Sequence, residues 1–342
     1  VFTSKKIVEE WLYKINKKNE RVVFERSNTS EFDLNSLLKQ NPKKEEQQFL
    51  QFIAKGTPDN QLFLTEVINR RVRENVSDIQ ELLDVIDWFQ NILTVWHPDT
   101  KPSWMQFLME SDKKVAASFE EFLKYFDTGI DGIIFKEMDF DKIFIPEEIK
   151  QDIQNGAKDA EVGSATWVEN QALNIQYLFV KEEDGSILVF KLMTVHNVEG
   201  ADIAVDHFDI GDESDGTQRI VDFIPMISLL FHSNKVFVVD ELERSLHPNL
   251  VYEVLNMFLN KSQTSSQLII AGHESSLLTQ KLLRKDEIWF TIKDEKGATS
   301  LSSLEEYAIR YDKQIRKDYL NGRYKAVPRF GNRNSLSILN AE

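Results

Sequence analysis

The stretch KVFVVDELERSLHPN, residues 235–249, decides how the rest of the chain is interpreted. Val236–Val239 is a short run of β-branched and aromatic residues, which is typical of a strand buried on both faces. Asp240 and Glu241 follow at once, and such a pair at the end of a parallel strand faces the crevice where α/β proteins bind ligands. Asp240 is suited to hold Mg²⁺, directly or through water, and Glu241 to orient or deprotonate an attacking water. The alternative interpretation is a strand that simply ends in solvent.

Strand-like and helix-like segments alternate around this stretch. An apolar helix precedes it, a second helix begins at Pro248, and the apolar strand Gln267–Ala271 follows. Ala204–Ile210 is a further strand candidate before the first helix. This alternation predicts parallel βαβ units and therefore an α/β fold.

The sequence ESDGTQR, residues 213–219, lies directly before the first of these helices. Ser214 and Asp215 are good N-cap residues, and Gly216 lets a backbone or ligand approach closely. Because a helix N-terminus offers free N–H groups and a partial positive charge, this turn suits a phosphate. The alternative is an ordinary capped helix, which Pro225 is expected to kink.

A polar side chain also follows the strand Gln267–Ala271. His273 comes after Gly272 and is suited to donate a hydrogen bond to a phosphate oxygen, although a histidine at a strand end also serves purely structural roles. Each of the two candidate strands is thus followed by side chains that are suited to bind Mg²⁺, water or phosphate.

Composition limits the classes of protein to consider. The chain has 342 residues, of which 42% are hydrophobic, enough for one large domain or two ordinary ones. The absence of cysteine excludes disulfides and thiolate metal sites and fits a reducing cytoplasm. The formal net charge of −15 argues against general nucleic-acid binding over the whole surface. No apolar run is long enough to cross a bilayer, so no membrane partner is expected.

The N-terminal half changes character along the chain. Lys6–Ile15 and Arg21–Glu25 predict a β-hairpin, and residues 27–44 predict a loop. Leu62–Val95 has a helical period, in which Ser77-Asp78 can restart the helix and which His97-Pro98 ends. The helical region is interpreted either as a partner-binding or DNA-contacting arm or as an inserted lobe with its own small core. Further predicted elements are the helix Phe119–Phe126 and the strands Gly132–Phe140, Gln176–Lys181 and Ile187–Thr194, the last two forming a hairpin.

The order and spacing of the motifs resemble the ATP-binding-cassette class of ATPases. Asp240 lies 26 residues after Ser214, and His273 lies 33 residues after Asp240. The resemblance is to the soluble branch with the chromosome-maintenance and recombination ATPases, and within it to bacterial defence ATPases related to OLD and RloA. It rests on SDGTQ, DE…RSLHP and the C-terminal residues Trp289, Phe290, Gly297, Ala298, Thr299, Tyr319, Leu320, Gly322, Arg323 and Tyr324.

The resemblance implies a fold and a division of the chain. The expected fold is an α/β ABC-ATPase (P-loop NTPase) core with a mixed sheet flanked by helices, plus an inserted helical lobe. The expected domains are a β-hairpin of the ATPase β-subdomain (1–26), a helical insertion or arm (27–160), the ATPase core (161–295) and a C-terminal helical tail (296–342).

The resemblance also implies roles for individual residues. Asp240 corresponds to the Mg²⁺-holding Walker B aspartate, Glu241 to the catalytic glutamate and His273 to the switch histidine. Ser245–Pro248 corresponds to the D-loop. The signature that closes on the ATP of the opposite subunit comprises Ser214, Asp215, Gly216, Thr217 and Gln218.

The implied partners follow from that family. Two copies are expected to form a homodimer that sandwiches ATP and Mg²⁺. The dimer is expected to control an effector nuclease of the RloB type in an antiphage or abortive-infection system.

The sequence departs from the family pattern in one large respect. No G-x-x-x-x-G-K-[ST] occurs in the 342 residues, so the phosphate-cradling P-loop is missing. We expect this Walker A motif and its strand to precede Val1; the alternative is a protein that has lost nucleotide binding. Glu274 is a smaller departure, since RloA-like proteins often have Asp there.

Two other functions remain open. One is a metal nuclease built on Asp240, Glu241 and Glu243, and the other is a DNA-repair clamp without an effector. In addition, Lys313–Phe330 combines cations with aromatic residues in an otherwise acidic chain, which suits an acidic partner or single-stranded nucleic acid. The alternative for that segment is a helix that packs its tyrosines on the core.

Overall fold

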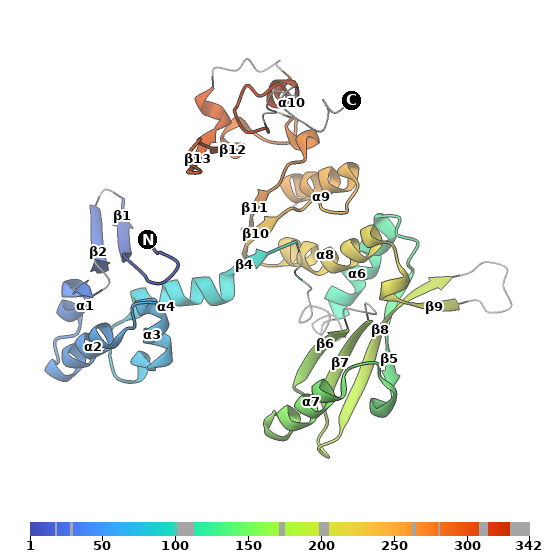
Figure 1. The fold of residues 1–342 in the computed structure, drawn as a ribbon, viewed down its shortest axis with the longest axis horizontal. Coiled ribbons are helices and arrows are strands. Elements are labelled where there is room, and N and C mark those ends of the chain that lie inside the picture. Colours follow the sequence, from blue (N-terminus) through green and yellow to red (C-terminus); the bar gives the residue numbers. More distant parts are fainter. Residues whose placement is uncertain are drawn as a thin grey trace, which may run out of the picture. The chain divides into compact units, whose positions relative to one another are not determined.

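The chain divides into two compact units, Val1–Thr94 and Val95–Glu342, which are described separately (Figure 1). The computed structural model describes residues 1–17, 19–27, 30–98, 100, 113–170, 175–197, 205–261, 265–279, 281–307 and 314–328. Among these residues, no helix is long and apolar enough to cross a membrane.

The first unit is a small antiparallel sheet packed with short helices. The predicted hairpin is confirmed, because β1 pairs with β2 from Glu10↔Arg26 to Asn16↔Asn19. The sheet order is β1-β2-β3, and β3 pairs with β2. The elements are β1 (Glu10–Asn16), β2 (Asn19–Ser27), β3 (Glu31–Asp33), α1 (Asn35–Gln40), α2 (Lys44–Gly56), α3 (Phe63–Asn69) and α4 (Gln80–Asp87).

This unit has its own apolar core. Phe24 and Phe63 are both fully buried and meet edge to face with ring centroids 5.0 Å apart. Beside them the carboxylate of Glu10 accepts the N–H groups of Phe63 at 2.7 Å and Leu64 at 3.3 Å, at the start of α3. Burial raises the pKa of Glu10 above its usual value, against the opposing effect of these hydrogen bonds. The N-terminal hairpin is therefore tied into the helices that follow it.

One prediction for this part of the chain is wrong, because residues 27–44 contain β3 and α1 rather than a loop. The stretch Leu62–Val95 is helical over α3 and α4, and α4 begins just after Ser77-Asp78, where a restart was expected. Arg71 adopts a left-handed conformation (φ +48°) that interrupts the helix after α3. The last residues of the stretch form the strand β4 (Leu93–Trp96), where β-branched and aromatic side chains favour extended backbone.

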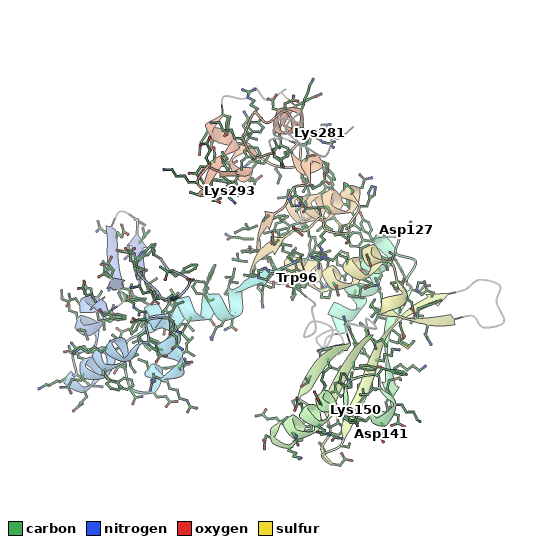
Figure 2. All side chains as sticks on the ribbon, in the orientation of Figure 1. Trp96, Asp127, Asp141, Lys150, Lys281 and Lys293 are labelled. Carbon is green, nitrogen blue, oxygen red and sulfur yellow. The ribbon has the colours of Figure 1, made fainter. Side chains whose placement is uncertain are left out.

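The centre of the second unit is a sheet of order β11-β10-β4. β10 (Val236–Asp240) and β11 (Gln267–Ala271) run parallel, as predicted. The helix α9 (Pro248–Lys261) lies between them in the chain, and residues 262–264 lie outside the described residues. Phe237 and Val239 are fully buried beneath α8 (Asp215–His232) and α9. Trp96, labelled in Figure 2, is also buried there and stacks on Phe223 of α8. The βαβ arrangement predicted from the sequence is confirmed.

A second, antiparallel sheet follows the order β5-β8-β7-β6, with β9 paired to β8 (Figure 1). The predicted strands Gln176–Lys181 and Ile187–Thr194 fall within β7 and β8, and the β7–β8 hairpin is confirmed. The predicted strand Gly132–Phe140 corresponds to β5, which ends two residues earlier, at Met138. The predicted strand Ala204–Ile210 is β9, while residue 204 lies outside the described residues. The elements are α6 (Lys113–Tyr125), β5 (Gly132–Met138), α7 (Glu147–Asp159), β6 (Ala165–Asn170), β7 (Ile175–Lys181), β8 (Ile187–Asn197) and β9 (Val205–Asp209).

The C-terminal part is a hairpin and a short helix around an aromatic cluster. β12 (Trp289–Lys293) pairs with β13 (Thr299–Ser303), and α10 (Ile315–Leu320) follows. The segment 296–342, expected to be helical, therefore contains the strand β13 before the helix α10. The structural division at Thr94 falls inside the range 27–160, which also contains strands; the functional boundaries at 26, 160 and 295 stay predictions.

Candidate functional site: the ends of two parallel strands

The turn after β10 holds the acidic pair in a strained backbone. Asp240 ends the strand with an exposed side chain, and Glu241 is half-buried. Glu241 (φ +49°) and Ser245 (φ +61°) both adopt the left-handed conformation. Outside glycine this conformation costs about 1–2 kcal/mol per residue, and such strain concentrates at functional sites. The packing around this turn therefore fixes a conformation that the residues alone would not choose.

The turn after β11 places His273 at the same edge of the sheet. Asp240 is in register with Ala271, and the N–H of Glu241 donates to the Ala271 carbonyl at 2.8 Å, which extends the parallel pairing by one bond. His273 follows two residues later, and 75% of its side chain is exposed. The structure thus brings the two predicted carboxylates and the predicted histidine to the carboxyl ends of adjacent parallel strands.

The third predicted motif forms the start of α8. Ser214 is its N-cap, and its Oγ accepts the N–H of Thr217 at 3.2 Å and lies 2.8 Å from the Thr217 hydroxyl. The Gln218 side chain turns back and donates to the Glu213 carbonyl at 2.8 Å. Asp215, the first helical residue, is exposed. The prediction of a capped helix is therefore confirmed. The same capped end is the surface that is expected to contact a phosphate.

The residue before this cap is held by the neighbouring sheet. The carboxylate of Glu213 accepts the Thr194 hydroxyl at 2.6 Å and lies 2.7 Å from Nε2 of His196. Both partners belong to β8, so the start of α8 is anchored to the antiparallel sheet. This contact was not predicted from the sequence, because it joins the start of a helix to a strand that lies about twenty residues earlier in the chain.

The acidic turn touches the start of α8. A Cβ added at Gly216 would lie 3.1 Å from the Ser245 carbonyl oxygen, so only glycine allows the two backbones to come this close without a shift. Ser245–Pro248, the predicted D-loop, ends where Pro248 opens α9, as expected for proline in a first helical turn.

The acidic turn also touches the loop that carries His273. Glu243 Oε1 accepts the backbone N–H of His273 at 2.6 Å, and the Glu243 side chain is only 13% exposed. Sequence reasoning placed Glu243 in a three-carboxylate nuclease centre instead. Among the described residues, no group of three or more His, Cys, Asp or Glu side chains is arranged to hold a metal ion.

The remaining donors fit a magnesium–nucleotide complex in part. Asp240 supplies an exposed carboxylate oxygen, the ligand type that Mg²⁺ prefers, and His273 supplies an exposed imidazole. A loop to enclose the phosphates is not encoded in the 342 residues. In the part of the chain that the structure describes, β11 ends the sheet, and Ile269 in its middle is 55% exposed.

Comparison with known proteins gives the same assignment for the fold. Residues 82–279, more than half of the chain, match the family described as "AAA domain, putative AbiEii toxin, Type IV TA system". The matched range includes β4, the start of α8, the acidic turn and His273. No curated protein matches the chain. An AAA domain has the α/β P-loop NTPase fold and the nucleotide chemistry of an ATPase. The chain therefore belongs to this family of AAA domains.

Proposed function

We propose that the chain is the signature- and Walker B-bearing part of an ABC-type ATPase in a bacterial antiphage or abortive-infection system. The observation that carries the proposal is the meeting of Asp240, Glu241 and His273 at one sheet edge. The contact of Gly216 with Ser245 supports it, because it sets the capped end of α8 against the same turn.

Each residue has a proposed role in this ATPase. Asp240 helps to hold Mg²⁺, Glu241 orients or deprotonates the attacking water, and His273 donates to the γ-phosphate. When bound, Mg²⁺ supplies positive charge beside the phosphates, so that catalysis consists mainly of positioning and electrostatic stabilisation. The side chains and N–H groups of Ser214–Gln218 bind the nucleotide held by the opposite subunit. A homodimer then encloses two ATP molecules.

The P-loop of this ATPase is proposed to come from a segment outside these 342 residues. No described strand pairs with the outer edge of β11, and this edge, beside an apolar surface, suits an added parallel strand. A Walker A strand at that position would end at the same sheet edge as Asp240 and His273. Until it is present, the chain lacks the strongest phosphate contacts.

The proposed output is control of a partner. ATP-driven dimerisation would regulate an effector protein, which we take to be a nuclease of the RloB type, in the cytoplasm. DNA contact through the helical region is the alternative use of the N-terminal unit, and it points to an SMC-like repair clamp.

The first test concerns turnover in the complete ATPase. Glu241→Gln keeps the size and hydrogen bonding of the side chain but removes its negative charge and basicity. It is expected to lower the ATP hydrolysis rate by about a thousandfold, within the range for loss of a general base, and to trap an ATP-bound dimer. Hydrolysis is followed by phosphate release and dimerisation by size-exclusion chromatography.

The matched control is Glu295→Gln in the exposed β12–β13 turn, which is expected to retain parental turnover. If Glu241→Gln hydrolyses ATP at the parental rate, Glu241 is not the catalytic carboxylate. Asp240→Ala separates the second role, because it is expected to weaken Mg²⁺-dependent nucleotide binding before it affects chemistry.

The second test concerns the chain as it stands. Because no P-loop is present, residues 1–342 are expected to bind ATP weakly or not at all in calorimetry. Micromolar affinity would place the phosphate site elsewhere in this chain and would overturn the proposal of an added strand.

A further inference from the structure

We propose that Glu243 is a positioning residue that fixes the backbone at His273 and couples it to the acidic turn. The inference rests on the proposed function only for its effect on catalysis. The contact itself belongs to the folded chain without nucleotide and is tested there.

The contact is a short, charge-assisted hydrogen bond from an exposed backbone N–H to a carboxylate that is itself mostly covered. Glu243 Oε1 accepts the His273 N–H at 2.6 Å, and the Glu243 side chain is 13% exposed. Hydrogen bonds to ionised acceptors are roughly twice as strong as neutral ones. The His273 side chain is 75% exposed and its Nε2 lies 3.9 Å from the same oxygen. The position of the ring is therefore set mainly through its backbone.

Gly272 shows that the structure makes room for this carboxylate. The backbone of Gly272 is not in the left-handed region, so its conformation does not require glycine. A Cβ at this position would instead lie 2.7 Å from Glu243 Oε1 and still closer to Oε2. A side chain at position 272 would therefore displace the Glu243 carboxylate, and glycine leaves the carboxylate in the place where it accepts the His273 N–H.

The conformation of the turn places the Glu243 side chain beside the loop that follows β11. The left-handed residues Glu241 and Ser245 flank Glu243, and its own carbonyl accepts the N–H of Leu246 at 3.0 Å. The same turn touches Gly216 through the Ser245 carbonyl. Five consecutive residues, 241–245, thus contact both the loop of His273 and the start of α8. A shift of this turn would move the proposed γ-phosphate contact and the proposed signature together.

The first experiment measures amide exchange at His273 in the 342-residue chain without nucleotide. Glu243→Ala removes the acceptor and is expected to speed exchange of this N–H at least tenfold. Glu243→Gln retains an acceptor oxygen and is expected to keep most of the protection. Unchanged exchange in Glu243→Ala would overturn the proposal. A matched control, Glu295→Ala in an exposed turn, is expected to leave exchange at His273 unaltered.

The second experiment tests the spatial link to Gly272 by a double-mutant cycle. Gly272→Ala alone is expected to lower Tm by several degrees, because the added Cβ collides with the carboxylate. In the Glu243→Ala background the same change is expected to cost clearly less, since the colliding atoms are gone. Strictly additive Tm shifts would show that Gly272 does not accommodate Glu243.

The third experiment measures ATP hydrolysis by the complete ATPase. Glu243→Ala is expected to lower kcat at least tenfold while KM for ATP changes less than threefold, and Glu243→Gln is expected to restore most of kcat. If exchange at His273 rises while kcat is parental, the positioning role is overturned. If the parental enzyme does not hydrolyse ATP at all, the proposed function fails, but the exchange and Tm results still decide whether Glu243 holds His273.

Discussion

The acidic turn after β10 and the aromatic cluster of the C-terminal part were both singled out in the sequence, but their polar side chains differ in exposure. The turn has polar side chains on left-handed backbone, half-buried at Glu241 and exposed at Ser245. In the cluster, Tyr324 is 1% exposed and stacks on Phe290 with ring centroids 4.5 Å apart. Polar side chains are therefore accessible in the turn for which we propose chemistry, whereas Tyr324 serves packing.

The cluster explains most of the described part of the segment 313–330. Tyr307 and Tyr319 also pack around Phe290, while Arg323 pairs with Asp318 at 2.9 Å. The alternative of tyrosines packed on a core is thus the arrangement found for Tyr319 and Tyr324. Lys313, Arg329 and Phe330 lie outside the described residues.

The largest expected stability effect is in the aromatic cluster. Tyr324→Ala removes a fully buried ring and leaves a cavity, which typically costs about 3–5 kcal/mol of unfolding free energy. Urea denaturation measures this loss. Glu241→Gln keeps the shape of a half-buried side chain and is expected to change the same quantity by less than about 0.5 kcal/mol. Equal effects at the two positions would contradict the division into packing and chemistry.

The next effect concerns the start of α8. Ser214→Arg fills the space proposed for the γ-phosphate with a bulky cation, and is expected to weaken ATP-driven dimerisation by at least about a hundredfold, on the order of 2.8 kcal/mol. Sedimentation of the complete ATPase with ATP measures it. Ser214→Ala is the matched control, because both variants lose the N-cap hydrogen bond, worth about 1 kcal/mol. Normal dimerisation of Ser214→Arg would leave this turn as a simple capped helix.

A smaller effect distinguishes the hydroxyl of Tyr324 from its ring. The hydroxyl is buried without a hydrogen-bond partner among the described residues, and burial raises the pKa of Tyr324. Tyr324→Phe is therefore expected to be neutral or to stabilise by up to about 1 kcal/mol.

The sign of the pH effect at Tyr324 follows from the raised pKa. As the pH rises through about 10, the unfolded tyrosine ionises before the folded one does, so stability falls. Tyr324→Phe is expected to lose that part of the fall between pH 9 and 11, as measured by urea denaturation at each pH. A variant with the same alkaline profile as the parent would show that another group causes the fall.

The central strands and their order were predictable from the sequence, whereas the contacts between their turns were not. Val236–Val239 and Gln267–Ala271 are apolar runs of strand length, so local pattern alone identifies them. Leu93–Trp96 was missed because four residues at the end of a helical pattern carry little periodic signal. The hydrogen bond that the His273 N–H donates to Glu243 joins residues 30 positions apart. Only Gly272 hints at it, since glycine at the end of a strand often marks a close approach.

The last prediction tests the cations beside the aromatic cluster. Arg323→Glu with Lys325→Glu reverses two exposed charges while Tyr324 between them stays buried. Because Arg323 pairs with Asp318 on the surface, its loss is expected to cost no more than about 1 kcal/mol of unfolding free energy. ATPase activity is expected to remain parental. If this surface receives an acidic partner, the variant loses co-purification of the effector, whereas the control Lys293→Glu with Lys296→Glu, in the nearby hairpin, retains it. Collapse of both activity and stability would instead show that these cations belong to the packing of the cluster. The described part of the segment would then serve packing alone, in contrast to the acidic turn.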